Sequence, residues 1–258
     1  MDRRAAHHGC RLRASRRSRR TSSLRRGAAS ANARWDNTVA ILSGDYLFAR
    51  ASEISTDLGV EVCRLLARTI AILCDGQIRE VDSSASVEQP IENYLAIIRR
   101  KTASLIATSC RLGALLSDAE AEHVDILEQF GDALGMAYQL SDDIMDITST
   151  QMELGKEPGQ DLREGVYTLP VLDALADDEH REELARILGH GAPDGEMLDR
   201  ALEIIRTGGS VDRARQAVTA EVERATGLAR RLPEGPAQHA LIQLAKFLAA
   251  RCGAEQGA

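Results

Sequence analysis

The stretch Gln139-Leu140-Ser141-Asp142-Asp143-Ile144-Met145-Asp146 places three carboxylates within about one helical turn, directly after an apolar run. On a helix, Asp142 and Asp146 are spaced i, i+4 and Asp143 and Asp146 are spaced i, i+3, which puts them on a shared face. Because like charges repel, a fold that keeps these acids together needs a cation between them. Carboxylate oxygens favour a hard cation such as Mg²⁺, which takes further oxygens from water and substrate phosphate. The stretch therefore predicts half of a metal-dependent diphosphate site, with a solvated acidic helix face as the plainer alternative.

The composition favours helices packed on helices. Aromatic residues make up 3% of the 258 residues, whereas alanine, leucine and isoleucine are abundant, a balance that is unlike that of a β-sandwich or barrel. No segment has a convincing strand pattern. The apolar periodicity predicts helices over 36–55, 58–81, 90–116, 118–148, 168–176, 178–188, 194–207, 210–231 and 236–251, with Asp57 and Ser117-Asp118 as N-caps. The sequence therefore predicts an all-α fold, a single helical bundle.

Charge and cysteine content narrow the class of protein. Residues 1–26 contain ten arginines and one acid, whereas the whole chain has a net charge of −7, so the rest of the chain is strongly acidic. An acidic body argues against nucleic acid as the partner. The five cysteines include no CxxC pair, which is typical of reduced cysteines in a cytoplasmic protein. No apolar run reaches the length of about 18 residues that predicts a transmembrane helix.

Residues 1–24 have no apolar periodicity and predict a disordered basic segment, distinct from a helical domain over 25–258. Three interpretations of this segment stay open. It resembles an Arg- and Ser-rich organellar leader, or a basic arm for nucleic acid or a membrane surface. The third, which we favour, is a misplaced start or a shifted reading frame.

The loop that follows the acidic stretch, residues 155–165, offers a cation. Its three glycines and one proline allow a tight backbone course, and Lys156 supplies a mobile ammonium group. A lysine beside a carboxylate-bound metal is suited to the phosphate oxygens that the metal does not contact. The plainer interpretation of Lys156 is a solvated loop lysine.

Two further residue pairs are candidates for the same site. Lys101 and Thr102 fall near the apolar side of the predicted 90–116 helix, so the pattern predicts that Lys101 points inward, although a mid-helix lysine is usually on the surface. Tyr138 and Gln139 precede the carboxylates by one turn, and we expect both to line one cavity wall. An aromatic face there could stabilise a developing carbocation, with core packing as the alternative.

Taken together, these motifs resemble those of the trans-polyprenyl diphosphate synthases. The stretch 138–146, followed by Gly-Lys-x-x-Gly-x-Asp-Leu-x-x-Gly-x-x-Thr-Leu-Pro over 155–170, resembles the second aspartate-rich region of that family. Upstream motifs also resemble the family's, in the same order; they are Arg25-Arg26-Gly27, Gly44-Asp45-Tyr46-Leu47-Phe48-Ala49, Gly76-Gln77 and Lys101-Thr102.

The resemblance implies a helical bundle of the isoprenoid synthase type and a reaction. An allylic prenyl diphosphate binds through Mg²⁺ and ionises, and its cation alkylates isopentenyl diphosphate. The implied roles are metal binding by Asp142, Asp143 and Asp146, diphosphate binding by Arg25, Arg26, Lys101 and Lys156, and catalysis by Lys101, Thr102, Tyr138 and Gln139. The family also implies a homodimer formed through the helices over 36–81.

The sequence departs from the family at its first aspartate-rich motif. Nothing before Arg25 resembles that motif, and the other aspartate pair, Asp177-Asp178, has a different context. We therefore expect an N-terminally incomplete fold with little chain elongation on its own. A terpene cyclase is the less favoured alternative, because its motif has Ser and Glu where this chain has Asp146 and Thr150. A non-catalytic regulatory subunit of a heteromeric synthase is the other alternative.

Overall fold

The computed structural model describes residues 24–25, 28–29, 34–149, 158–176, 180–189 and 191–253. The chain divides into two compact units, Met1–Ala51 and Ser52–Ala258. In the first unit, two short strands, β1 (Leu24–Arg25) and β2 (Ala28–Ala29), pair antiparallel. The expectation of no strand is wrong for these four residues. The predicted boundary between 1–24 and 25–258 stays a prediction, since residues 1–23 lie outside the described residues.

Helices account for the remaining elements, in the order that the apolar periodicity predicts. The helix α3 (Asn37–Asp57) begins in the first unit and ends in the second. The second unit continues with α4 (Val60–Ser83), α5 (Ile91–Ile98), the π-helix η1 (Arg99–Ala103), α6 (Ser104–Leu115), α7 (Ala121–Thr148), α9 (Gln160–Glu164), α10 (Leu169–Ala176), α11 (Arg181–Gly189), α12 (Gly195–Thr207), α13 (Ser210–Ala229) and α14 (Pro236–Arg251). The all-α fold is thus confirmed.

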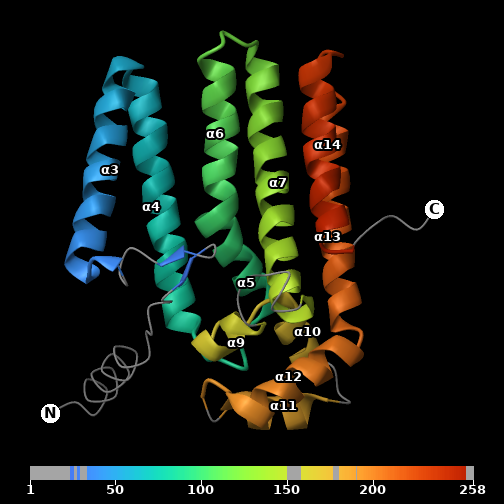
Figure 1. The fold of residues 1–258 in the computed structure, drawn as a ribbon. Helices are drawn as coiled ribbons and strands as arrows, with labels where there is room; N and C mark the ends of the chain where they lie inside the picture. Colours follow the sequence, from blue (N-terminus) through green and yellow to red (C-terminus); the bar gives the residue numbers. More distant parts are fainter. Residues whose placement is uncertain are drawn as a thin grey trace, which may run out of the picture. The chain divides into compact units, whose positions relative to one another are not determined.

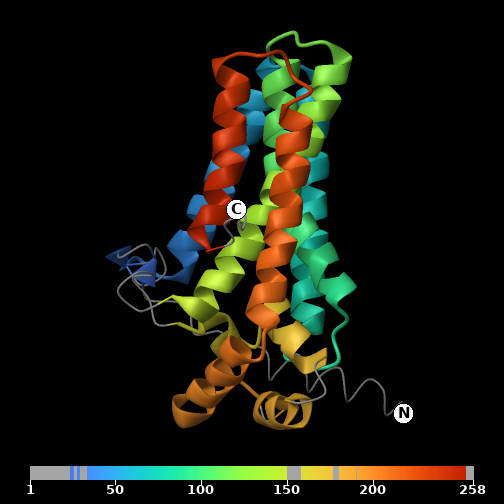
Figure 2. The ribbon, with the colours of Figure 1, turned by 90° about the vertical axis from the view of Figure 1, so that its right-hand side faces the viewer.

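The long helix α7 is the centre of the second unit. It packs against α6, α13 and α14 along its length and against α9, α10 and α12 near its C-terminal end. Figure 1 shows α4, α6 and α7 running alongside one another, with the short helices α9 to α12 gathered at one end. The view in Figure 2 shows α13 and α14 beside α7, with the short helices at that same end. Buried apolar residues of α7, such as Phe130, Leu140 and Ile144, form the middle of the core.

Small residues let α7 approach η1 and α6 closely. A Cβ added to Gly135 would lie 2.5 Å from the Cα of Ala103, and one added to Gly131 would lie 2.7 Å from the Cα of Ala107. These distances are shorter than any carbon–carbon contact that packing tolerates, so both positions require glycine. The backbones of η1 and α6 therefore pack directly against that of α7.

Two helices begin later than their predicted caps. Asp57 is the last residue of α3, and α4 starts after Gly59, whose positive φ of 107° suits glycine. The helix α7 starts after Glu120, because Asp118 adopts a left-handed φ of 53° in the preceding turn. Both predicted N-caps are wrong, since Asp57 ends the preceding helix and Ser117-Asp118 lie in the turn before α7.

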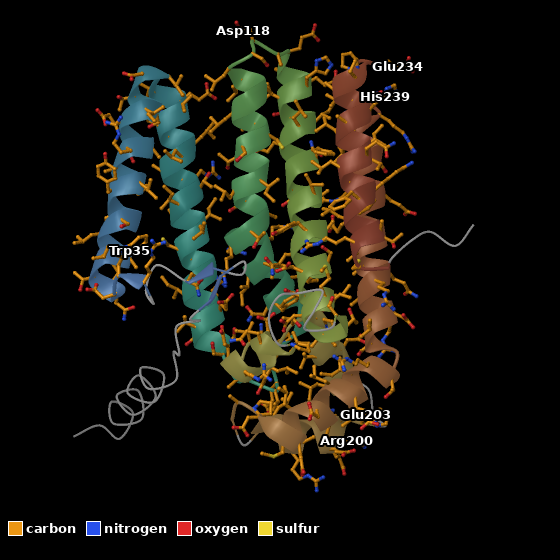
Figure 3. The ribbon with its side chains drawn as sticks, in the orientation of Figure 1. Trp35, Asp118, Arg200, Glu203, Glu234 and His239 are labelled. Atoms are coloured by element: carbon orange, nitrogen blue, oxygen red, sulfur yellow. The ribbon has the colours of Figure 1, made fainter. Side chains whose placement is uncertain are left out.

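The two ends of the second unit differ in their elements. Figure 3 labels Asp118, Glu234 and His239 at the end where α6 turns into α7 and α13 turns into α14. Arg200 and Glu203 of α12 lie at the other end, among the short helices, where Arg200 Nη1 is 2.8 Å from Glu203 Oε2. None of the described helices is long and apolar enough to cross a membrane.

Candidate active site

The predicted helix over 90–116 is interrupted by a π-helix at the two residues that the sequence singles out. η1 spans Arg99–Ala103 and carries Lys101 and Thr102 between α5 and α6. A single π turn widens the helix locally and re-aims the side chains on it, and such turns often mark functional sites. Gly76 of α4 supports this turn, because a Cβ there would lie 3.0 Å from the backbone nitrogen of Lys101.

A cavity of about 140 Å³ lies beside η1 in the second unit. Residues of α4, α5, η1, α7 and the segment 161–168 line it, and they include Lys101, Thr102 and Gln139. Four acidic residues, Glu80, Asp143, Asp161 and Glu164, also line it, whereas Lys101 is the single lysine or arginine among the described lining residues. A cavity with this charge balance repels an anion unless further cations accompany it.

A chain of hydrogen bonds connects η1 to the acidic stretch of α7. Thr102 Oγ1 donates to Gln139 Oε1 at 2.8 Å, and Gln139 Nε2 donates to Asp143 Oδ1 at 2.8 Å. The hydroxyl of Tyr94, on α5, donates to Asp143 Oδ2. Three of the predicted site residues, together with Tyr94, therefore form one connected network at the cavity wall.

The Asp143 carboxyl group at the centre of this network is almost completely buried, at 3% exposure. Its burial raises its pKa to about 7; the hydrogen bonds from Tyr94 and Gln139 oppose the rise, and Asp142 and Asp146 add to it. Burial and the nearby Asp143 also raise the pKa of the Tyr94 hydroxyl well above its ordinary value, so the hydroxyl keeps its proton. Both donors to Asp143 are neutral, and they stabilise its charge less than a cation would.

Asp146 joins α7 to the short helix α9. Its Oδ2 accepts a hydrogen bond from the backbone N–H of Asp161 at 3.0 Å, and its carbonyl oxygen accepts one from Gly159 at 2.8 Å. Gly159 and Gly165 flank α9 with φ values of 74° and 73°, which favour glycine. The predicted tight course of this loop is confirmed for its described part, which begins at residue 158.

Asp142 faces a different direction from Asp143. Its side chain is 49% exposed, and its Oδ1 lies 3.0 Å from Nη2 of Arg251, near the C-terminal end of α14. The Arg251 guanidinium also lies over the ring of Tyr138, with its carbon 5.6 Å from the ring centroid. The prediction that Tyr138 and Gln139 line one cavity wall is wrong for Tyr138, because consecutive helical residues point about 100° apart.

The three carboxylates of the acidic stretch do not converge on one point. Among the described residues, no group of three or more histidine, cysteine, aspartate or glutamate side chains is placed to share a metal ion. The donor chemistry nevertheless fits a hard divalent cation, since a buried carboxylate with a high pKa and two further carboxylates lie on adjacent turns. Of the predicted diphosphate ligands, Lys101 lines the cavity; Arg26, Lys156 and the side chain of Arg25 lie outside the described part of the chain.

Three residues of this site carry no sequence signal. Glu80, Tyr94 and Arg251 contact Lys101, Asp143 and Asp142, respectively, from positions 21, 49 and 109 residues away in the chain. Tyr94 falls on the apolar side of the predicted 90–116 helix, and this pattern predicts its burial but not its partner.

Known proteins share the sequence and the fold. The polyprenyl synthetase family matches residues 21–205. The chain is 41% identical over 231 residues to nonaprenyl diphosphate synthase of Mycobacterium tuberculosis, covering 89% of this chain and 69% of that protein. It is 38% identical to heptaprenyl diphosphate synthase component 2 of Geobacillus stearothermophilus, covering 88% and 71%.

A solved structure agrees with both the sequence match and the fold. Geranylgeranyl pyrophosphate synthase from Corynebacterium glutamicum, complexed with calcium and isoprenyl diphosphate, superposes with a TM-score of 0.76 at 43% identity, covering 86% of this chain and 70% of that one. The family match extends over more than half of the chain, and the described helices follow the same fold. The chain therefore belongs to the polyprenyl synthetase family, whose members are prenyl-transferring enzymes.

Proposed function

We propose that the cavity beside η1 holds the diphosphate of an allylic prenyl diphosphate, and that the chain transfers the prenyl group to isopentenyl diphosphate. The observation that carries the proposal is the buried Asp143 carboxyl group, hydrogen-bonded to neutral donors at the wall of an acid-lined cavity. A carboxylate in such a place is stabilised by a bound cation, and a diphosphate needs the same cation to enter. The calcium and isoprenyl diphosphate in the C. glutamicum relative support this assignment.

Asp142, Asp143 and Asp146 would hold Mg²⁺. When bound, the metal would supply positive charge that stabilises the departing diphosphate. Lys101 would contact a phosphate oxygen in the cavity, with Arg25, Arg26 and Lys156 as the further diphosphate ligands that the motifs indicate. Lys101 is the member of this set that the structure describes at the cavity.

The other residues of the network would act on the prenyl group. Thr102 and Gln139 are fixed to each other by a hydrogen bond, so their oxygen atoms keep a constant position beside the reacting carbons. Ile97 and Ile98 line the cavity and exclude water that would otherwise capture a carbocation. Tyr138 lies outside this network and this cavity, and the Arg251 guanidinium lies over its ring. The catalytic role of Tyr138 is the part of the proposal that rests on the motif alone.

The oligomeric state and location are also proposals. Large apolar side chains of α3 (Ile41, Leu42, Tyr46, Leu47 and Phe48) and of α4 (Val60, Ile78 and Val81) are exposed. Exposed apolar side chains in this number indicate an interface, and a homodimer through these helices fits the expectation from the family. Among the described residues, Cys63, Cys74, Cys110 and Cys252 form no disulfide, which supports a cytoplasmic location.

A second candidate function rests on the relative named heptaprenyl diphosphate synthase component 2. Its name indicates one component of a synthase that has more than one. This chain would then be a subunit that needs a different partner chain for full activity. Size-exclusion chromatography with light scattering distinguishes a homodimer from a monomer that awaits such a partner.

Binding of a metal and a prenyl diphosphate analogue tests the main proposal. Calorimetric titration of the protein with a non-hydrolysable prenyl diphosphate analogue in Mg²⁺ should show saturable binding, and a variant with Asp142, Asp143 and Asp146 all changed to alanine should show none. The variant Asp132→Ala is the matched control, because Asp132 lies on the same helix and pairs with Arg224 and Arg99. Equal binding by the wild type and the triple variant would contradict the proposal.

An elongation assay tests the remaining part of the expectation from the sequence. Residues 1–258 contain one acidic triplet of this kind, so the polypeptide supplies metal ligands from one side. We expect it to bind Mg²⁺ and diphosphate and yet to give little product from farnesyl and isopentenyl diphosphates. Robust turnover by the 258-residue polypeptide alone would show that one triplet is sufficient.

A further inference from the structure

The cavity contains an ion pair that the proposed reaction does not use. Lys101 Nζ lies 2.9 Å from Oε1 and 2.7 Å from Oε2 of Glu80, and both side chains line the cavity. Glu80 comes from α4 and Lys101 from η1, so the pair connects two elements across one wall. If Glu80 engaged every hydrogen-bond donor of the Lys101 ammonium group, the lysine could not bind a phosphate.

The geometry leaves Lys101 able to serve both groups. An ammonium group has three N–H donors, and the Glu80 carboxylate engages at most two of them. The lysine side chain is 37% exposed and that of Glu80 is 20% exposed, so Lys101 is the more accessible member of the pair. The remaining donor is therefore free to meet an anion in the cavity.

Glu80 is itself held in place from its own helix. Gln77 Nε2 donates to Glu80 Oε1 at 2.9 Å, one turn earlier on α4. The close contact of Gly76 with the backbone of η1 fixes the spacing between the two elements. A chain of contacts thus runs from Gln77 through Glu80 to Lys101, and each member restricts the rotamers of the next.

From these contacts we infer that Glu80 is a positioning residue, which orients the Lys101 ammonium group toward the diphosphate, with Gln77 in turn orienting Glu80. The inference rests on the proposed function of the cavity as a diphosphate site. A free lysine side chain samples many rotamers, and binding an anion would have to order all of them. Glu80 orders the side chain before the anion arrives, which improves affinity by preorganisation.

The first arm of the test measures the Glu80–Lys101 contact without any ligand. The chain has three lysines, Lys101, Lys156 and Lys246, so acetylation by a small anhydride can be read at each one by peptide mass spectrometry. In Glu80→Gln, we expect acetylation of Lys101 to rise several-fold relative to the exposed Lys246, because the amine loses its ionic partner. The control Glu164→Gln removes another cavity carboxylate, one that accepts a hydrogen bond from Gln160. It should leave the ratio unchanged.

The second arm measures the affinity for inorganic diphosphate in Mg²⁺ by calorimetry, in a double-mutant cycle. Glu80→Gln should weaken binding by about three- to ten-fold, and Gln77→Ala should weaken it by less. In a Lys101→Met background, Glu80→Gln should have no further effect, because its role passes through the lysine. A purely structural role would weaken binding in both backgrounds.

Several outcomes would overturn the inference. Unchanged acetylation of Lys101 in Glu80→Gln would show that the contact does not control the lysine. Tighter diphosphate binding in Glu80→Gln would show that Glu80 competes with the anion and does not assist it. If the wild type binds no diphosphate in Mg²⁺, the proposed function of the cavity is wrong, and so is a positioning role for Glu80 toward diphosphate. The acetylation arm would then show separately whether Glu80 holds Lys101.

Discussion

Two neighbouring carboxylates near the C-terminal end of α7 differ in their exposure and in their partners. Asp143 faces the cavity, is 3% exposed and accepts hydrogen bonds from neutral donors. Asp142, the preceding residue, has a side chain that is 49% exposed and pairs with the Arg251 guanidinium. Water and the Arg251 guanidinium satisfy the charge of Asp142, whereas the buried Asp143 has hydrogen bonds from two neutral donors. The comparison teaches that, in the proposed metal site, Asp143 on the cavity side would gain most from a bound cation, whereas Asp142 would exchange the Arg251 guanidinium for the metal.

The largest effect, on metal affinity, is expected from Asp143→Asn, which keeps the shape of the buried side chain and removes its charge. Because Asp143 is the buried carboxylate without a cationic partner, the affinity for Mg²⁺ with inorganic diphosphate should fall by more than about 100-fold. This loss exceeds the one typical of a residue that contacts a metal ligand and not the metal itself. Calorimetric titration measures it. The control Asp132→Asn should bind as the wild type does, and a change of less than three-fold in Asp143→Asn would contradict the contrast between the two faces.

The free energy of unfolding should depend on pH because Asp143 is buried. The pKa of Asp143 is about 7 in the folded protein and lies near the ordinary aspartate value when unfolded. Below both values, both states hold the proton; as the pH rises between them, the unfolded state releases it and the folded state does not. The free energy of unfolding should therefore fall by up to about 1.4 kcal/mol for each pH unit of this window, through this group alone.

Mg²⁺ should recover this loss. In the proposed site Mg²⁺ would bind the ionised Asp143 carboxylate, so the rise in melting temperature on adding Mg²⁺ should be larger near pH 8 than near pH 5.5. Differential scanning calorimetry at the two pH values measures both effects. In Asp143→Asn the pH dependence over this window should flatten, and an unchanged slope would mean that another group is responsible.

Removal of one donor on the buried face should have a smaller effect. Tyr94→Phe leaves Asp143 Oδ2 buried without its hydroxyl partner, and should cost about 1–3 kcal/mol of the free energy of unfolding. The Tyr94 hydrogen bond lowers the Asp143 pKa, so the cost should be greater near pH 8, where the carboxylate is ionised, than near pH 5.5. Urea denaturation at both pH values measures it.

Tyr167→Phe is the matched control for this substitution. The Tyr167 hydroxyl donates to the backbone carbonyl of Leu188 at 3.0 Å, so its acceptor carries no charge. The loss should be about 0.5–1.5 kcal/mol, without the pH dependence. If the two substitutions have the same cost at both pH values, the charge on Asp143 is not what Tyr94 stabilises.

The sequence predicts the helices and the acidic cluster well because both are local patterns. Apolar periodicity places α7 and the helices around it, and the spacing of the three aspartates puts them on adjacent turns. The π-helix at Lys101 has no such pattern, and its last residue, Ala103, packs closely against Gly135 of another helix. The spacing in the sequence also does not distinguish Asp142 from Asp143, because burial depends on the residues that pack around each of them.

The partners of the site residues are beyond the reach of such patterns. Glu80, Tyr94 and Arg251 reach the site through tertiary contacts over 21 to 109 residues of chain. None of them has a spacing that links it to its partner, and each depends on how α4, α5 and α14 pack against η1 and α7. The roles of Arg26, Lys156 and the Arg25 side chain stay predictions, because they lie outside the described residues.

The smallest effect is expected on the exposed face, from Arg251→Gln. The Arg251–Asp142 pair is partly exposed, and its removal should change the free energy of unfolding by less than about 1 kcal/mol. The affinity for Mg²⁺ without diphosphate should nevertheless increase slightly, because the guanidinium no longer competes for Asp142, and added salt should reduce the difference between variant and wild type. Titration of Mn²⁺ in place of Mg²⁺, followed by electron paramagnetic resonance, compares the metal affinity of the variant with that of the wild type. Weaker metal binding in Arg251→Gln would mean that Arg251 orients Asp142 for the metal. The partners of Asp142 would then assist metal binding, and the contrast with Asp143 would be wrong.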